Sequence, residues 1–205
     1  MNELRELVDQ IPAPVVTAWI WVSAFACGYA VGAVNPAAII ARLRGTDLRS
    51  VGSGNPGATN AGRAFGWKVG VLVGALDIAK GLLPVLVVTY LAGEVPGLIA
   101  GVAAVLGHIS SPFLRGRGGK GVATSLGAVL AVQPVWALVV VAVFGVAFAA
   151  TRRVGISSVA GSLALVPCAL VSGSGSAQVA FAATLTAIIV ARHRTNIAVA
   201  ATALR

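Results

Sequence analysis

Long apolar runs separated by short polar segments dominate the chain. Seven of these runs predict helices, near residues 15–41, 67–92, 97–112, 121–132, 134–151, 157–171 and 176–191. A helix needs about 20 predominantly apolar residues to cross the hydrocarbon core of a bilayer, and most of the runs are near that length. The run at 121–132 is much shorter, so a short, tilted or partly re-entrant helix is expected there. The pattern predicts an all-α integral membrane protein with about seven transmembrane helices.

The composition supports a membrane class. Of the 205 residues, 58% are hydrophobic and only 10% are charged, whereas a soluble domain carries about a quarter charged residues. No polar stretch is long enough for a separate soluble domain, so residues 1–205 are expected to form a single polytopic domain. Residues 1–14 are acidic and contain proline. They lack the basic region and the small-residue cleavage site of a secretory signal.

Basic residues alternate with apolar runs in a way that predicts orientation. The turns at 93–96, 133–134 and 172–176 contain none of them, whereas the other connections carry nearly all the arginine and lysine; these are residues 42–66, 113–120, 152–156 and 192–205. The positive-inside rule places these connections in the cytoplasm. With an odd number of spans, the N-terminus (Glu3, Glu6 and Asp9) is then outside and the C-terminus is cytoplasmic. Several cytoplasmic loops can therefore form one site on that side.

Other function classes find little support. The net charge of +9 could indicate a nucleic-acid partner, but no aromatic residues interleave with the basic ones, as a base-stacking platform requires. His108 and His193 are the only histidines and the carboxylates are scattered, so no metal or cofactor is predicted. Cys27 and Cys168 lie in apolar runs and are interpreted as buried, inert thiols.

The first candidate segment, residues 47–63, combines glycine with hydrogen-bonding side chains. Glycine lets the backbone approach an anion, and Arg49 and Arg63 can each clamp a phosphate through two parallel hydrogen bonds. So much polar content is unfavourable beside lipid unless it lines a site. For Arg42 and Arg44, a role in topology alone is favoured. The candidate site residues of this segment are Gly52, Ser53, Gly54, Asn55, Asn60 and Arg63.

The second candidate is a cationic, glycine-dense loop between two apolar runs. Gly116, Gly118, Gly119 and Gly121 surround Lys120. Their backbone N–H groups and the start of the following helix can surround a phosphate. The loop is not a nucleotide-binding Walker A motif, because Leu114 stands where its first glycine belongs and Gly121 follows the lysine. His108 precedes the loop, with structural and functional roles equally consistent with its position.

The third candidate lies at the end of the last apolar run and reads Arg192-His193-Arg194-Thr195-Asn196. His193 can act as a base, as a hydrogen-bond donor to phosphate, or as an interfacial residue, and the sequence leaves these open. Ser157 and Ser158 begin another run on the same membrane face. Capping of the helix N-terminus is expected for one of them, and contact with phosphate is also possible.

Asp77 and Lys80 interrupt an apolar run at a spacing of three residues. Either charge alone would cost about 2.5–3.5 kcal/mol at the membrane centre. At this spacing the two side chains share a helix face, so a structural ion pair is favoured over catalysis. No nucleophile motif occurs in a suitable context, so any chemistry is expected to rest on positioning and charge stabilisation.

Taken together, the three segments resemble the motifs of a known family. Residues 52–60 with Arg63, residues 107–124 and residues 193–197 are similar, in order and spacing, to those of the PlsY family of bacterial acyl-phosphate:glycerol-3-phosphate acyltransferases. The resemblance covers about residues 28–197. It implies an enzyme of the bacterial cytoplasmic (inner) membrane that moves a fatty acyl group from acyl phosphate to the 1-hydroxyl of sn-glycerol 3-phosphate. The products are 1-acyl-sn-glycerol 3-phosphate (lysophosphatidic acid) and phosphate, in phospholipid biosynthesis.

The resemblance also implies residue roles and a partner. Ser53 and Arg63 correspond to the essential pair of the first motif. Lys120 with Gly118, Gly119 and Gly121 corresponds to the glycerol-phosphate loop, His193 and Asn196 belong to the site, and Ser157 and Ser158 correspond to phosphate ligands. The functional partner is the soluble acyltransferase that forms acyl phosphate.

Two features depart from the family pattern. The family's third motif is followed by an Arg-Leu pair and a glutamate, whereas residues 198–204 contain no carboxylate. The segment at 32–36 reads Gly-Ala-Val-Asn-Pro, where the family commonly has Gly-Ser and a proline. A non-enzymatic paralogue that binds acyl phosphate or lysophospholipid, or a transporter of phosphorylated solutes, therefore stays as an alternative. The short, almost uncharged outer turns disfavour the transporter.

Overall fold

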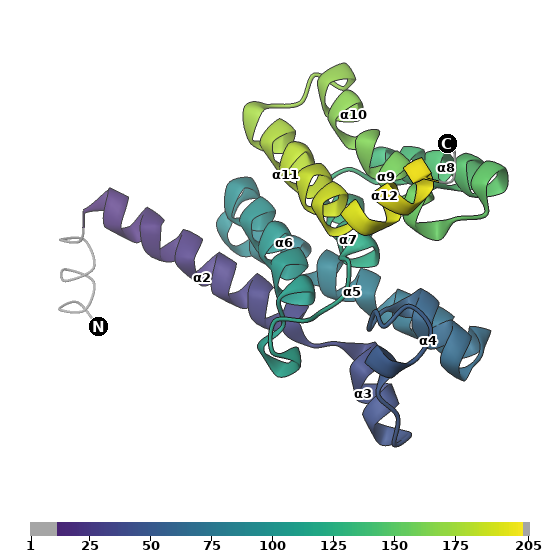
Figure 1. The fold of residues 1–205 in the computed structure, drawn as a ribbon. Coiled ribbons are helices and arrows are strands. Elements are labelled where there is room, and N and C mark those ends of the chain that lie inside the picture. The colour runs from purple at the N-terminus through teal and green to yellow at the C-terminus, as the bar shows by residue number, and fades with distance from the viewer. Residues whose placement is uncertain (1–11, 203–205) are drawn as a thin grey trace.

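The computed structural model describes residues 12–202, which form helices joined by short segments, with no strand in that range (Figure 1). In chain order the elements are α2 (Ala13–Ala33), α3 (Pro36–Leu43), the 3-10 turn η1 (Leu48–Ser50), α4 (Ala58–Phe65), α5 (Trp67–Ala92), α6 (Glu94–Ile109), the 3-10 turn η2 (Pro112–Leu114), α7 (Val122–Val132), α8 (Pro134–Thr151), α9 (Val154–Leu163), α10 (Leu165–Val171), α11 (Ser176–Arg192) and α12 (Arg194–Thr202).

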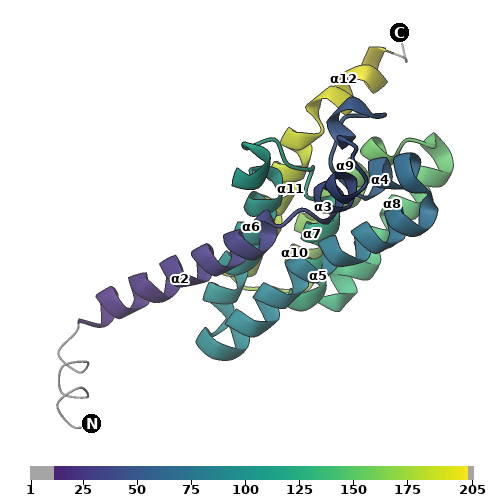
Figure 2. The same cartoon turned by 90° about the horizontal axis from the view of Figure 1, so that it is seen from below.

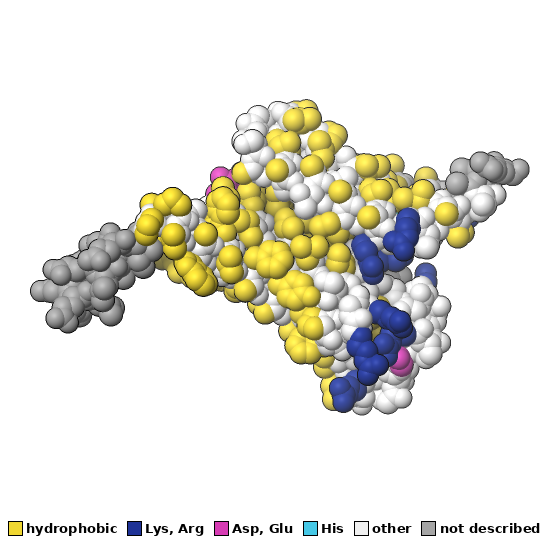
Figure 3. All heavy atoms as spheres, turned by 60° about the vertical axis from the view of Figure 1, so that its left-hand side comes forward, with side chains coloured by type: hydrophobic (Ala, Val, Ile, Leu, Met, Phe, Trp, Pro, Cys, Tyr) yellow, Lys and Arg dark blue, Asp and Glu magenta, His cyan; other side chains and the backbone are white. Residues whose placement is uncertain are grey.

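The apolar segments coincide with the predicted runs. Five stretches are long and apolar enough to cross a membrane: Ala13–Leu43, Trp67–Ala92, Glu94–Leu114, Pro134–Thr151 and Val154–Val171. Two shorter apolar helices, Val122–Val132 and Ser176–Arg192, account for the remaining runs. Apolar side chains form a broad band over the surface, and lysine and arginine gather beside it (Figure 3). The all-helical membrane architecture predicted from the pattern is therefore confirmed, whereas the number of crossings and their orientation stay predictions.

Small residues bring the backbones of neighbouring helices close together. A Cβ atom at Gly28 or Gly32 of α2 would overlap the carbonyl oxygens of Ala100 and Ala104 of α6. Close backbone approach at small residues is a usual way for helices to associate within a membrane. The contact holds the C-terminal half of α2 against α6, and it brings the break after α2 next to the end of α6, where His108 lies.

A second close contact joins α5 to α7. A Cβ at Gly81 of α5 would overlap the carbonyl oxygen of Thr124 of α7, and one at Gly127 would overlap that of Ile78. A larger apolar core lies beside this contact, among α5, α6, α7, α8, α10 and α11, and includes Val105, Val129, Trp136, Phe181 and Leu185. Consequently, the start of α7 is fixed against the middle of α5, which carries Asp77 and Lys80.

Two proline residues divide helices that the pattern predicted as continuous. The run at 15–41 forms α2 and α3, separated at Val34 and Asn35. Proline disfavours helical conformation in the preceding residue, and Asn35 is extended, with φ −114° and ψ 101°. In the run at 157–171, α9 ends at Leu163 and α10 begins at Leu165. Pro167 explains that break, because its ring clashes with the carbonyl four residues earlier.

Other local expectations were also wrong. Helix α9 begins at Val154, so Ser157 and Ser158 lie one turn inside it rather than at its N-cap, which is Arg153. Helices α4 and α12 form in segments that were expected to be loops. Cys27 is exposed and Cys168 partly exposed, because they lie on faces of α2 and α10 that other helices do not fully cover. Both cysteines are free.

Candidate functional site

The first loop, residues 47–57, is held in shape by one buried amide. Asn60 of α4 is 1% exposed. Its Nδ2 donates to the carbonyls of Leu48 (3.0 Å) and Val51 (2.9 Å), and its Oδ1 accepts from the backbone N–H of Ser53 (3.1 Å). Gly52 turns there with φ +56°, and a Cβ at this position would overlap the Asn60 amide. Both polar atoms of the predicted candidate Asn60 are therefore hydrogen-bonded to the loop itself.

Ser53 of the first loop and Arg63 of the adjoining helix α4 are the candidate side chains on the solvent side. Both residues are exposed, and no ion pair of Arg63 occurs within residues 12–202. Arg49, by contrast, is bonded to Asp47, with Nη2 2.8 Å from Oδ2. This bonding to Arg49 lowers the pKa of Asp47. Of the two arginines predicted to clamp phosphate, only Arg63 has its guanidinium unoccupied in the described chain.

The remaining first-loop candidates support the turn. Gly54 has φ +68°, a conformation that favours glycine. Asn55 is partly buried, and its side chain lies against Gly57. Asn35 anchors the loop from the α2–α3 break, because its Nδ2 donates to the carbonyl of Pro56 at 3.0 Å.

The second loop, residues 115–121, lies directly on the end of α6. The N–H groups of Gly118 and Gly119 donate to the carbonyls of Ile109 and His108, both at 3.1 Å. Side chains at these two glycines would overlap His108: its carbonyl at Gly118 and its ring at Gly119. These two predicted phosphate donors are therefore occupied. Within the described chain, the N–H groups of Lys120 and Gly121 have no backbone partner. These two residues lie directly before the first turn of α7, whose N-cap is Gly121.

The third segment, residues 192–196, closes over the second loop. Arg192 Nη2 donates to the carbonyls of Gly119 (3.1 Å) and Gly118 (3.4 Å). Lys120 Nζ donates to Oδ1 of Asn196 in α12. The amide of Asn196 also lies against Gly155, at the start of α9. The structure thus brings together Lys120 and Asn196, which are 76 positions apart in the chain.

His193 is buried beside these cations and has a defined tautomer. Its Nδ1 lies 2.8 Å from the carbonyl of Ile189, so Nδ1 carries the hydrogen and Nε2 has the lone pair. Burial lowers the pKa of His193, the Ile189 bond opposes that shift, and the charges of Lys120 and Arg192 lower the pKa further. The imidazole is therefore neutral near neutral pH, with Nε2 able to accept a proton.

Lys120 carries a charge that no carboxylate balances among the described residues. Its only hydrogen-bond partner there is a neutral amide, and its pKa is lowered by burial and by the nearby charge of Arg192. Lys120 and Arg192 repel each other, so an anion bound beside them would be stabilised by both charges. Arg192 was not among the predicted site residues. Its position next to His193 in the same segment was the available signal.

Ser157 and Ser158 are buried in α9, whose start contacts the third segment at Asn196. Their hydroxyls donate to the carbonyls of Arg153 (3.0 Å) and Val154 (2.8 Å), four positions earlier. In this arrangement their oxygens can accept hydrogen bonds but their protons are occupied. Contact with phosphate would require the hydroxyls to rotate, because phosphate oxygens accept hydrogen bonds.

The first loop joins the other two segments through the protein interior. Within residues 12–202, no side-chain hydrogen bond links Ser53 or Arg63 to Lys120 or Asn196. The connection runs instead through Lys80, whose Nζ donates to the carbonyl of Val34 at 2.7 Å. Figure 2 shows α3, α4, α9 and α12 at the same end of the molecule.

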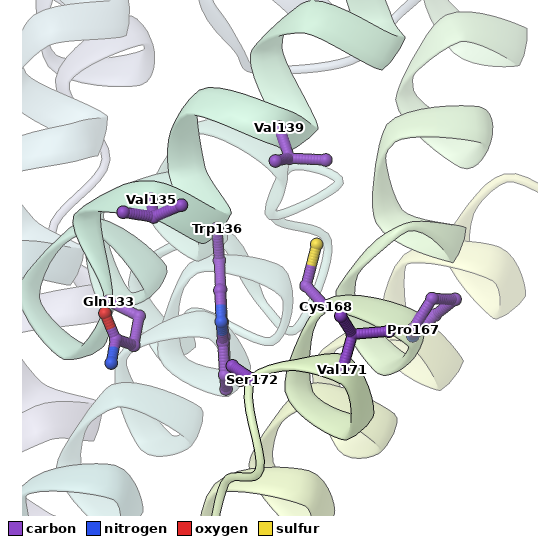
Figure 4. A pocket seen from close by; sticks show the side chains of 8 residues that line it. All are labelled: Gln133, Val135, Trp136, Val139, Pro167, Cys168, Val171 and Ser172. Atoms are coloured by element: carbon purple, nitrogen blue, oxygen red, sulfur yellow. The ribbon is translucent and has the colours of Figure 1, made fainter.

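In contrast to the cationic loop segments, a pocket between α8 and α10 is apolar. It has a volume of about 460 Å³ and is lined mainly by apolar side chains, with Gln133 and Ser172 at its polar edge (Figure 4). It contains no cation and so has nothing to hold a phosphate. The described residues also contain no group of three side chains suited to a metal ion. Among the described residues, Arg63, Lys120 and Arg192 all lie outside this pocket.

Comparisons with known proteins agree with these motifs. The family model described as glycerol-3-phosphate acyltransferase matches residues 22–202. Glycerol-3-phosphate acyltransferase of Aquifex aeolicus is 41% identical over 171 residues, covering 82% of this chain and 89% of that protein. That of Thermoanaerobacter sp. (strain X514) is 38% identical over 170 residues, covering 82% and 86%.

A solved structure extends the likeness to three dimensions. The crystal structure of PlsY, an integral membrane glycerol 3-phosphate acyltransferase, in its glycerol 3-phosphate form, matches with a TM-score of 0.86 and 38% identity. The match covers 89% of this chain and 92% of that one. The lysophosphatidic acid form of the same protein matches with a TM-score of 0.84. The chain belongs to the glycerol-3-phosphate acyltransferase family.

Proposed function

We propose that the protein transfers a fatty acyl group from acyl phosphate to the 1-hydroxyl of sn-glycerol 3-phosphate, giving 1-acyl-sn-glycerol 3-phosphate and phosphate. The observation that carries the proposal is the junction of Lys120, Arg192 and Asn196 in a member of this family. Both substrates are phosphate anions, and a lysine without a carboxylate partner suits them. The solved relative exists in glycerol 3-phosphate and lysophosphatidic acid forms, which agree with one substrate and one product.

The anion site has a cationic and a backbone component. Lys120 Nζ contributes the charge, and the free N–H groups of Lys120 and Gly121, at the start of α7, contribute directed donors. Gly118 and Gly119 shape this arrangement, because their own N–H groups hold the loop to α6. Ser53 of the first loop and Arg63 of α4 contribute to binding the phosphate of the other substrate, acyl phosphate. The shape of the first loop is set by Gly52, Gly54, Asn55 and Asn60.

The reaction needs orientation more than a protein nucleophile. The hydroxyl oxygen of glycerol 3-phosphate attacks the carbonyl carbon of the mixed anhydride, the carbon–oxygen bond to phosphate breaks, and the proton leaves the hydroxyl. His193 Nε2 accepts that proton in our proposal, because its Nδ1 is fixed to Ile189 and its ring is neutral. Arg63 stabilises the charge of the departing phosphate, while Lys120 holds the phosphate of glycerol 3-phosphate.

The decisive test is product formation by the purified protein in lipid. Protein reconstituted in a lipid mesophase receives palmitoyl phosphate and glycerol 3-phosphate, and phosphate and lysophosphatidic acid are measured together. We expect equal amounts of both, with product formation falling about 10- to 100-fold in Lys120→Ala. Lys68→Ala is the matched control, because Lys68 is exposed at the start of α5 beside Trp67 and should retain wild-type turnover.

The same assay separates the alternatives. Folded protein that releases no product above spontaneous hydrolysis of acyl phosphate, yet binds lysophosphatidic acid, would identify a non-enzymatic paralogue. This outcome has a specific motivation, because residues 198–202 of α12 carry no carboxylate. Uptake of glycerol 3-phosphate into proteoliposomes without chemistry would identify a transporter.

We further propose seven membrane crossings in the bacterial inner membrane, with the loops and the C-terminus in the cytoplasm. The gathering of lysine and arginine at one end supports this orientation; the acidic residues Glu3, Glu6 and Asp9 lie outside the described residues. In a background lacking Cys27 and Cys168, an impermeant maleimide added to whole cells should label Ser174→Cys but not Ser50→Cys. The reverse labelling would overturn the orientation. The soluble enzyme that forms acyl phosphate is the expected supplier of the donor.

A further inference from the structure

A buried polar cluster in the middle of the protein has no part in the mechanism above. It consists of Asp77 and Lys80 of α5 and His108 of α6, which are 2%, 6% and 4% exposed. Lys80 Nζ lies 2.8 Å from Asp77 Oδ1, so the predicted ion pair is confirmed. His108 Nδ1 faces the same carboxylate oxygen at 3.5 Å. One carboxylate therefore lies between two basic side chains that belong to different helices.

Lys80 connects this cluster to the first loop. Its Nζ also donates to the carbonyl of Val34 at 2.7 Å, in the break between α2 and α3. The next residue is Asn35, whose side chain caps α3 through the N–H of Ala38 (2.8 Å) and holds Pro56 of the first loop (3.0 Å). Two residues, Val34 and Asn35, and two hydrogen bonds thus lead from the ion pair to the loop that carries Ser53.

His108 connects the cluster to the second loop. The carbonyl of His108 accepts from the N–H of Gly119. The ring edge with Nε2 lies so close to Gly119 that a Cβ there would overlap it. Because Nδ1 faces Asp77 and Nε2 faces Gly119, the ring is a spacer of fixed length between the ion pair and the residue before Lys120.

A purely stabilising role explains this arrangement poorly. Two buried charges lose their hydration, and well-packed apolar side chains of similar volume often serve stability as well or better. What apolar side chains cannot supply is a hydrogen bond to a free carbonyl in a helix break and a directed contact on a glycine loop. The His108 contact ends on Gly119, next to Lys120. The Lys80 contact ends on Val34 and reaches the first loop through the neighbouring Asn35, whose amide holds Pro56.

We propose that Asp77, Lys80 and His108 form a positioning cluster that sets the first and second loops relative to each other for the two phosphate substrates. The inference rests on the proposed acyl transfer, and assigns the two loops to different substrates. Lys80 positions the first loop for acyl phosphate, and His108 positions the second loop for glycerol 3-phosphate. Asp77 orients both. None of the three contacts substrate.

The test replaces each arm of the cluster without leaving an uncompensated charge. Asp77→Asn combined with Lys80→Met removes the ion pair and the bond to Val34. His108→Asn keeps a donor near Asp77 but withdraws the group that faces Gly119, and His108→Gln restores a polar group there. Thr186→Val is the matched control, because Thr186 makes a comparable hydrogen bond to the carbonyl of Ser162 (2.8 Å), between α11 and α9.

We expect the two arms to give different kinetic effects. The double variant should raise KM for acyl phosphate at least tenfold, and His108→Asn should raise KM for glycerol 3-phosphate at least tenfold. Each variant should change the other KM less than threefold, and His108→Gln should recover most of the loss. A fall in Tm with both KM values unchanged, as in Thr186→Val, would overturn the positioning role.

Amide hydrogen exchange keeps the inference separate from the proposed reaction. Exchange should accelerate over residues 47–57 in the double variant and over residues 115–121 in His108→Asn, with the remaining peptides unchanged. If the wild-type protein forms no product, the proposed acyl transfer is wrong. The localised exchange pattern in the variants would still establish that the cluster is coupled to the two loops. Uniform acceleration, or no change in either loop, would overturn the coupling whether or not the protein is an enzyme.

Discussion

Lys80 is buried and Lys120 is partly buried, but their electrostatic surroundings are opposite. Lys80 forms an ion pair with Asp77 and bonds to the carbonyl of Val34. Lys120 bonds only to the neutral amide of Asn196 and lies near the second cation Arg192. The first charge is neutralised by the protein itself, whereas the second has no carboxylate partner among the described residues. In our proposal, the balance of charge around each lysine, more than its burial, distinguishes the structural cation Lys80 from the substrate-binding cation Lys120.

The largest expected effect is on stability, at Lys80. Lys80→Met alone leaves Asp77 as an uncompensated buried charge, which typically costs about 3–5 kcal/mol. Adding Asp77→Asn removes that charge, so the double variant should recover most of the loss. Tm measured in detergent, with and without the second substitution, checks this. A double variant as unstable as the single one would show that Asp77 is not the cause.

Lys120 should show the reverse behaviour. Lys120→Met removes a cation from beside Arg192 and leaves no buried carboxylate behind, so Tm should change by no more than a few degrees. Loss of a charged hydrogen bond to substrate is worth about 1.5–3 kcal/mol, which corresponds to a fall of about 10- to 100-fold in kcat/KM. Steady-state kinetics with varied glycerol 3-phosphate measures it. Unchanged kinetics with a lowered Tm would place Lys120 with Lys80 as a structural cation.

The contrast between the two lysines was only partly readable in the sequence. The ion pair follows from the spacing of Asp77 and Lys80 on one helix. The contact of Lys120 with Asn196 could not be predicted in the same way, because it depends on how α7, α11 and α12 pack. Family resemblance, not spacing, placed both residues in one site.

The fold shows the same division between local and tertiary information. The apolar runs located the membrane helices, and Pro36 contained the signal for the break after α2. Helix α4 was missed because it follows a glycine-rich loop and its eight residues are too few to be stable as a helix on their own. It forms where Ala61 packs in one cluster with Ala37 and Val73. The occupied N–H groups of Gly118 and Gly119 were equally unreadable, because they depend on where α6 ends.

The pH dependence of the reaction sharpens the account of the cationic site. His193 must be neutral to accept a proton, and burial holds its pKa below 6.5, as do Lys120 and Arg192. Activity should therefore persist below pH 6.5 and fall only as the pH drops through this lowered pKa. Removing one positive neighbour in Arg192→Gln should raise the pKa and move the acid limb to higher pH, whereas the exposed Arg194→Gln should not. An acid limb that stays in place in Arg192→Gln, and also in His193→Gln, would assign proton acceptance to a substrate phosphate.

The smallest effect is expected at Ser158, and it tests how far the anion site extends from Lys120. The hydroxyl of Ser158 already donates to the carbonyl of Val154, so it has no free proton for phosphate. Its bond to the helix backbone is worth about 0.5–1.5 kcal/mol at most, and alanine fits the same helical position. Ser158→Ala should therefore change KM for either substrate less than threefold, and Ser157→Ala should behave alike, since its hydroxyl is bound to Arg153. A tenfold rise in KM in either variant would mean that the hydroxyl rotates away from its carbonyl when substrate binds. The start of α9 would then belong to the same site as Lys120, because Gly155 already lies against Asn196.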